Sequence, residues 1–242
     1  MHPHISVAKP LSELKFDLAK FDPDHVDCKS NVDIVDECGL QQGFSHRYRD
    51  FAYPTNHTFL LSSCKRQADA LKCLRASAKC LPPLPKQVLI AMVNSRQKYN
   101  KKICAEKQSE AATKLLELNQ CMANNKPTVE KAIQAELNSI LVPESIVNSK
   151  IDSVQERIKQ SCCSVARVRK EFMDATVPHC KQHSQVASDV IDSYLAETVG
   201  IICPDFESKR HDCEKLPKLV APKSSNARFF VRPIINVIQT LV

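Results

Sequence analysis

The chain has 242 residues, of which 12 are cysteine, only 3 are glycine and none is tryptophan. Three glycines cannot supply the turns of an all-β sandwich or barrel, nor the glycine-rich loops of nucleotide-binding α/β folds. The formal charge of +7 is uneven, since residues 1–40 hold 8 acids and 4 bases, whereas residues 47–102 hold 12 bases and 2 acids. These features predict an all-α, disulfide-stapled helical bundle with a basic surface.

The pattern of apolar residues, prolines and cysteines divides the chain into five segments. Residues 1–45 are expected to form an acidic, irregular N-terminal segment. Residues 46–125 and 156–215 are predicted to be two related helical-hairpin repeats, joined by linking helices at 126–155. A basic and apolar tail with a short helix follows at 216–242. The sequence contains no run of ~18 apolar residues, so no membrane span is predicted. The chain is interpreted as a mature form without a visible signal peptide.

The first strong helical pattern begins near Thr58, which is a plausible cap. Apolar side chains then recur at steps of three, four and seven residues, as on one face of a helix, namely Leu60, Cys64, Leu71, Leu74, Ala78 and Leu81. The prolines at 82 and 83 break this helix. Three lysines on another face are expected to lie in solvent, namely Lys65, Lys72 and Lys79.

Further helical patterns follow in chain order. The next helix has one line of side chains that consists of Leu89, Met92, Arg96, Tyr99 and Ile103. Another helix spans about 108–123. Pro127 and Pro143 can each start a helix, the second of which ends at Pro178. A helix is also predicted over about 185–202, and an amphipathic one follows Pro233.

A predicted basic surface gathers cations from the first two helices, namely Lys65, Lys72, Lys79, Arg96, Lys98, Lys101 and Lys102. One interpretation is that this surface docks the acidic N-terminal segment of the same molecule. The other is an anionic partner, such as a glycan, a membrane surface or a nucleic acid. Nucleic acid is the least favoured, because the bases are not interleaved with aromatic residues and no binding motif appears.

The even number of cysteines predicts six disulfides formed in an oxidising, extracellular compartment. Zinc is the alternative, but the chain offers only the adjacent Cys162 and Cys163 and a cluster of His179, Cys180 and His183. A disulfide with exposed histidines beside it is favoured for that cluster. A single Asn-x-Thr sequon predicts glycosylation at Asn56, which fits a secreted protein.

Hairpin geometry predicts two disulfides directly. Folding the chain back at residue 84 puts Cys64 and Cys104 20 residues from the turn, or about 30 Å along adjacent antiparallel helices. Folding at residue 183 does the same for Cys163 and Cys203. Level cysteines on packed helices can reach the ~5.5 Å Cα separation of a disulfide, so Cys64–Cys104 and Cys163–Cys203 are predicted. By the repeat, Cys80–Cys121 and Cys180–Cys213 follow, and the other four are left to pair among themselves, namely Cys28, Cys38, Cys73 and Cys162.

The cysteine spacing also indicates an internal duplication. When Cys64 is set against Cys163, Cys104 falls against Cys203, 40 residues further on in both copies. The helical phase and the position of the break agree in the two copies. The second copy departs from the first at Phe172, which stands where the first has a cysteine.

The run from Cys162 to Phe172, followed by Cys180 and Cys203, resembles secreted cysteine-rich helical proteins of arthropods. Insect haemolymph glycoproteins and nematode extracellular domains with many cysteines look similar in general style. The resemblance covers roughly residues 60–215, although such proteins carry a further cysteine at the position of Phe172. It implies an extracellular, non-catalytic protein.

The motifs of several enzyme classes are missing from the sequence. No glycine lies in a nucleophile-elbow setting, and no His-Glu-x-x-His motif occurs. Oxidised cysteines cannot supply a catalytic thiolate. Three glutamates at near-helical spacing are interspersed with lysines and are interpreted as a solvated face, namely Glu106, Glu110 and Glu117. The protein is therefore predicted not to be an enzyme, with no cofactor and no metal site.

Two functions fit these observations. The first is an extracellular carrier of a hydrophobic small molecule or lipid, because a stapled bundle can hold a cavity between helices. The apolar run at 229–231 with Ile234 and Ile235 could cover such a cavity, or could be plain core. The alternative is a secreted interaction, defence or matrix protein that binds an anionic or protein partner through its basic surface.

Overall fold

The computed structural model describes residues 18–28, 31–40, 53–129, 145–146, 151, 153–203, 213, 215–216 and 231–239. No strand occurs in these ranges. The predicted all-α, disulfide-stabilised bundle is therefore confirmed. The elements are η2 (Leu18–Lys20), α1 (Asn31–Leu40), α2 (His57–Ser77), η5 (Ala78–Cys80), α3 (Pro83–Ile103), α4 (Glu110–Asn124), α7 (Val154–Thr176), η6 (Lys181–His183), α8 (Ser184–Ile202) and α9 (Val231–Gln239).

Side-chain caps and prolines set the starts of the long helices. The Oδ1 of Asn56 accepts from the N–H of Phe59 at 2.9 Å and caps α2. Ser109 and Ser153 cap α4 and α7 in the same way, and such caps satisfy backbone donors that the first helical turn leaves free. Pro83 is the first residue of α3, where a missing N–H costs nothing.

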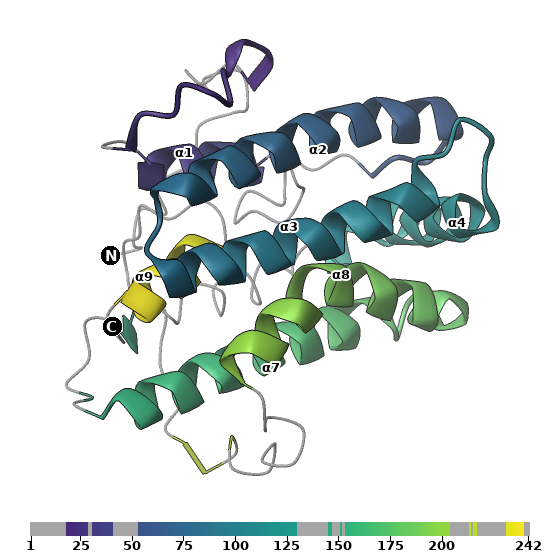
Figure 1. Ribbon diagram of the computed structural model, residues 1–242. Coiled ribbons are helices and arrows are strands. Elements are labelled where there is room, and N and C mark those ends of the chain that lie inside the picture. The colour runs from purple at the N-terminus through teal and green to yellow at the C-terminus, as the bar shows by residue number, and fades with distance from the viewer. Residues whose placement is uncertain are drawn as a thin grey trace, which may run out of the picture.

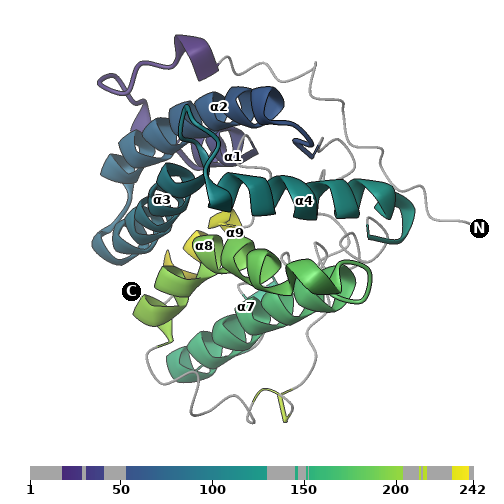
Figure 2. The same ribbon diagram turned by 90° about the vertical axis from the view of Figure 1, so that its right-hand side faces the viewer.

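Two antiparallel helical hairpins form the body of the protein (Figure 1). Helices α2 and α3 form one hairpin, and α7 and α8 form the other. The largest interface between helices lies between α3 and α8, so these two helices join the hairpins. Helix α4 crosses the molecule between them (Figure 2) and contacts α2, α3 and α8.

The core confirms the periodicities of the long helices. All six members of the stripe predicted for α2 and the turn after it are buried. The largest fully buried side chains come from several helices and include Leu60, Leu89, Leu118, Ile191 and Ile235. Helix α4 begins two residues later than predicted, and α7 begins at Val154, after the cap at Ser153. Most residues of the predicted linking helices, at 126–155, lie outside the described residues.

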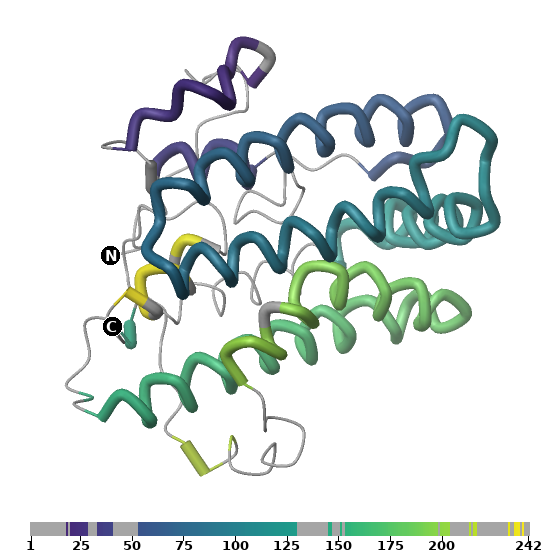
Figure 3. The backbone as a smooth tube through the Cα atoms, viewed as in Figure 1, coloured from purple at the N-terminus to yellow at the C-terminus, as the bar shows by residue number. Residues whose placement is uncertain are grey.

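The two chain ends add helices to the first hairpin. Helix α1 packs on α2, although its segment was expected to be irregular. Helix α9 contacts α1, α3 and α7, and the tube in Figure 3 shows its yellow segment beside the start of α3. Arg232 of α9 donates to Asp36 of α1 at 2.7 Å and to Asp33 at 3.3 Å. Because Asp36 is buried, this pair ties the C-terminal helix to the N-terminal one.

All twelve cysteines form disulfides, as predicted. The predicted Cys64–Cys104 bond is confirmed and joins α2 to the end of α3, with a Cα separation of 5.7 Å. The remaining bonds are Cys28–Cys80, Cys38–Cys73, Cys121–Cys180, Cys162–Cys203 and Cys163–Cys213.

The predicted Cys163–Cys203 bond is wrong by one residue. Cys162 bonds Cys203 with a Cα separation of 5.9 Å, and Cys163 bonds Cys213 instead. The level of a residue along a helix does not say which face it occupies, and adjacent residues point about 100° apart. Only Cys162 of the adjacent pair faces the end of α8.

The pairings Cys80–Cys121 and Cys180–Cys213 are also wrong. Cys80 lies in η5, at the end of α3 opposite to α4 (Figure 1), about 30 Å from the other end at 1.5 Å per residue. Cys121 of α4 instead meets Cys180 at the turn of the second hairpin. Of the four cysteines left over, Cys38 and Cys73 do pair, but Cys28 and Cys162 do not pair within that group. The duplication stays a prediction.

Candidate functional site

A groove of about 320 Å³ opens between α2 and α3 on the predicted basic surface. Ten described residues line it, namely Cys64, Ala68, Leu71, Lys72, Arg75, Val93, Gln97, Asn100, Lys101 and Cys104. They recur every three or four residues on each helix, which places them on the two facing sides of the hairpin. The groove therefore follows from the periodicity and register of these two helices.

Two contacts fix the register of the groove. The Cys64–Cys104 disulfide closes one end. Toward the other end, Nη2 of Arg75 crosses from α2 to α3 and donates to Asn94 Oδ1 at 2.7 Å and to Gln97 Oε1 at 3.3 Å. In this antiparallel register, set by the disulfide, Ala68 of α2 is level with Asn100 of α3, so a small side chain lies opposite an amide.

The floor of the groove is apolar and its rim is cationic. Leu71 and Val93 are buried in the core below it. Lys72 and Lys101 are exposed and line it from α2 and α3, together with Arg75. Lys72 lies 3.3 Å from Asp69, whereas Lys101 has no ion pair within the described part of the chain. None of the ten lining residues is acidic. Asp69 offsets the charge of Lys72 only, so the rim keeps a net positive charge.

Asn100 is the unusual member of the lining. Its side chain is only 8% exposed, and neither Oδ1 nor Nδ2 has a hydrogen-bond partner among the described residues. Buried amides in native proteins almost always have partners, and leaving one without any costs about 1–3 kcal/mol. A ligand group in the groove would supply the missing partner.

The structure corrects the prediction for Arg96, which was assigned to the basic surface but is only 3% exposed. Nη1 of Arg96 donates to Ser193 Oγ at 2.6 Å, and Nη2 donates to Gln67 Oε1 at 2.9 Å. Its guanidinium lies 3.9 Å from the centre of the Tyr194 ring and 5.2 Å from that of Tyr99. Arg96 shares the spacing of the core side chains Leu89 and Met92, and this spacing was the signal that it faces inward.

Burial raises the pKa of both tyrosine hydroxyls in this cluster above the ordinary value of 10.0. The positive charge of Arg96 acts in the opposite direction on both, but desolvation is the larger effect. Both phenols therefore stay protonated at neutral pH. Within the described residues no carboxylate bonds to Arg96, so cation–π contacts and neutral acceptors hold this buried charge.

The remaining cations of the predicted surface are exposed, as expected, namely Lys65, Lys72, Lys79, Lys98, Lys101 and Lys102. Lys79 donates to the carbonyl of Pro23 at 3.3 Å, which is one contact with the N-terminal segment. Asp33 and Asp36 of that segment pair with Arg232 of α9 and not with this surface. The basic surface thus retains exposed cations around the groove.

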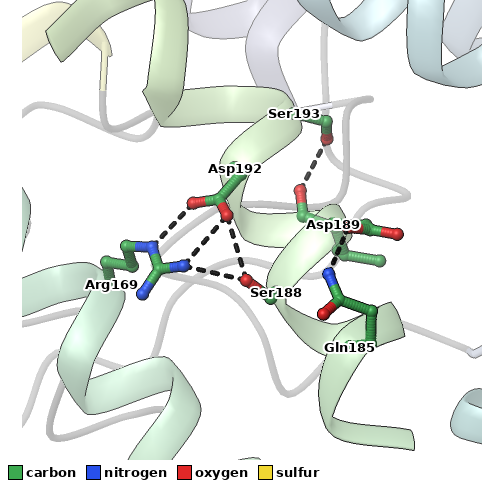
Figure 4. Close-up of polar contacts among 7 residues, drawn as sticks. Arg169, Gln185, Ser188, Asp189, Asp192 and Ser193 are labelled. Carbon is green, nitrogen blue, oxygen red and sulfur yellow. Dashed lines mark hydrogen bonds and ion pairs between the residues drawn. The ribbon is translucent and has the colours of Figure 1, made fainter.

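A second polar cluster joins the helices of the other hairpin (Figure 4). Arg169 of α7 donates to both carboxylate oxygens of Asp192 on α8, at 2.7 and 3.0 Å, and to Ser188 Oγ at 2.8 Å. Such bidentate pairs are geometrically specific. Because Arg169 bonds side chains of α8 through both Nε and Nη2, we assign this cluster to hairpin packing.

None of the other sequence-derived candidates lines the groove. Cys180 is bonded to Cys121, and Nδ1 of His183 lies 3.9 Å from Glu117 Oε2. No group of three potential metal ligands occurs among the described residues. Asn56 is exposed at the start of α2. Phe229 and Phe230 lie outside the described residues, whereas Ile235 is buried in the core.

Comparison with known protein families, curated proteins and solved structures finds no match for this chain. The resemblance to arthropod haemolymph proteins therefore stays a prediction from cysteine spacing. Among the described helices, none combines the length and the apolar character needed to cross a bilayer.

Proposed function

We propose that the protein is a secreted, non-catalytic binding protein that holds an anionic ligand on the α2–α3 face. The observation that carries this proposal is the groove, whose rim has Lys72, Arg75 and Lys101 but whose ten described lining residues include no acid. Clefts lined by charge of one sign concentrate ligands of the opposite sign.

Six disulfides support the secreted location, because such bonds persist in oxidising compartments and are rare in the cytosol. The site also combines the two functions that the sequence suggested. Its apolar floor suits a hydrophobic carrier, and its cationic rim suits an anionic partner. The ligand is proposed to lie in this groove, and not in an interior cavity under an apolar lid.

Chromatography on immobilised heparin, used as a generic polyanion, tests the proposal. The wild-type protein should elute above physiological salt of about 0.15 M. The groove double variant Lys72→Gln/Lys101→Gln should elute clearly earlier than Lys107→Gln/Lys181→Gln. The control pair loses the same charge from exposed positions that do not line the groove.

Two outcomes would contradict the proposal. Wild-type elution below physiological salt would show that the face does not recognise anions. Equal elution of the two double variants would show that net charge alone determines retention. Circular dichroism of all variants should be unchanged, because the four lysines are exposed.

A further inference from the structure

We propose that the α2–α3 groove binds a small amphiphilic carboxylate, with its head group at Asn100 and Lys101 and its apolar body along Leu71 and Val93. This inference rests on the proposed function, because it names the class of anion that the basic face recognises. Unlike a polyanion, which would bind across the basic face, this ligand would enter the groove.

The head group has a defined place. The amide Nδ2 of Asn100 is a buried donor without a partner among the described residues, and the adjacent Lys101 has no ion pair there. A carboxylate between them would accept from the amide and from the ammonium group, and Lys72 lines the opposite side of the groove. Charge-assisted hydrogen bonds of this kind are about twice as strong as neutral ones.

The apolar body follows from the shape of the groove. The lining runs from the Cys64–Cys104 disulfide to Arg75 and Val93, a span of eleven residues on each helix, or about 16 Å at 1.5 Å per residue. Ala68 leaves room beside Asn100, and Leu71 and Val93 form an apolar floor. A volume of about 320 Å³ is at the lower end of small-molecule sites. It therefore suits a medium-chain fatty acid and not a bulky lipid.

Isothermal titration with decanoate, below its micelle-forming concentration, tests this inference. Decan-1-ol supplies the body without the charge, and acetate supplies the head without the body. Decanoate should bind wild-type protein at least about tenfold more tightly than either control, since decan-1-ol lacks the charge-assisted hydrogen bonds and acetate lacks the apolar contacts.

Two variants locate the site. Lys101→Gln should weaken decanoate binding about tenfold, whereas Lys98→Gln should change it less than about twofold. Lys98 is exposed on the same helix, three residues away, and does not line the groove. Ala68→Phe should fill the groove and abolish binding, and thermal unfolding checks that it folds. Because both lysines are exposed, the lysine comparison is decisive even if Ala68→Phe does not fold.

The outcomes separate this inference from the proposed function. Heparin retention that depends on Lys72 and Lys101, without decanoate binding, would overturn the inference and leave the anion-binding face in place. Equal binding of decanoate to Lys101→Gln and Lys98→Gln would also overturn it. Absence of both heparin retention and decanoate binding would overturn both proposals.

Discussion

Arg96 of α3 lies with its guanidinium 3.9 Å from the centre of the Tyr194 ring of α8. This contact stands in the largest interface between helices, which joins the two hairpins. Cation–π contacts that exclude water can contribute about 2 kcal/mol. The buried arginine thus stabilises the interface between the hairpins, whereas Lys98 and Lys101 on the same helix are exposed to solvent.

Replacement of Arg96 tests this role. Arg96→Ala should lower the free energy of unfolding by about 3 kcal/mol, because it removes the ring contacts and leaves Gln67 without its arginine donor. Lys98→Ala, at an exposed position of the same helix, should change it by less than about 0.5 kcal/mol. Urea unfolding measures both. A small and equal effect of the two substitutions would show that the cation–π cluster contributes little.

The two tyrosines of the cluster predict a loss of stability in alkali. Burial raises the pKa of Tyr99 and Tyr194 in the folded state, while the unfolded chain ionises near 10.0. Their contribution is therefore fully present below pH 10 and is lost as the pH rises above that value. Denaturant midpoints measured across this pH range should fall. Tyr99→Phe should make the fall of the midpoint with pH less steep. An equally steep fall would contradict a raised pKa of Tyr99.

We expect substitution of Asn100 to have opposite effects on stability and on ligand binding. Asn100→Leu removes a buried amide without partners, so the free energy of unfolding should rise by about 1 kcal/mol. The same change removes the donor for the ligand and should weaken decanoate binding. Gln87→Leu, an exposed amide on α3, serves as the matched control and should do neither. A variant that is less stable and binds normally would show that Asn100 has a packing role only.

Asn56 predicts a glycan that coexists with a helix cap. Oδ1 of Asn56 caps α2 by accepting from Phe59, and a glycan attaches to the amide nitrogen, so both can be present. Thr58→Ala and Asn56→Asp should each remove the glycan from protein secreted by eukaryotic cells. Asn56→Ala should in addition cost about 1 kcal/mol relative to Asn56→Asp, because aspartate also caps helices. Natural material with no mass change after endoglycosidase treatment would contradict glycosylation.

The sequence predicted the long helices well, for a physical reason. Leu60, Leu71 and Leu74 recur with the period of a helix that buries one face, and this signal is local. Helix α1 was missed because its segment is acidic and lacks a long apolar stripe. The burial of Arg96 was indicated by its spacing, but its charge led to the opposite assignment.

Cysteine pairing and the groove depend on relations that the sequence does not carry. The equal distance of Cys64 and Cys104 from the hairpin turn identified their bond. Which of Cys162 and Cys163 bonds Cys203 depends instead on the rotation of α7 about its own axis. The groove likewise depends on the register that brings Ala68 level with Asn100. Both features depend on tertiary packing, which periodicity alone cannot predict.

The disulfides fall into two closed sets. Three bonds lie between Cys28 and Cys104, and three lie between Cys121 and Cys213. Within either stretch, a single cut in the backbone leaves the fragments covalently linked. The exposed residues 105–108 fall in the interval between the two sets, from Cys104 to Cys121, which no bond crosses. A protease that cuts there would leave two independently cross-linked halves, held together by non-covalent packing around Arg96 and released from each other by denaturant without any reductant.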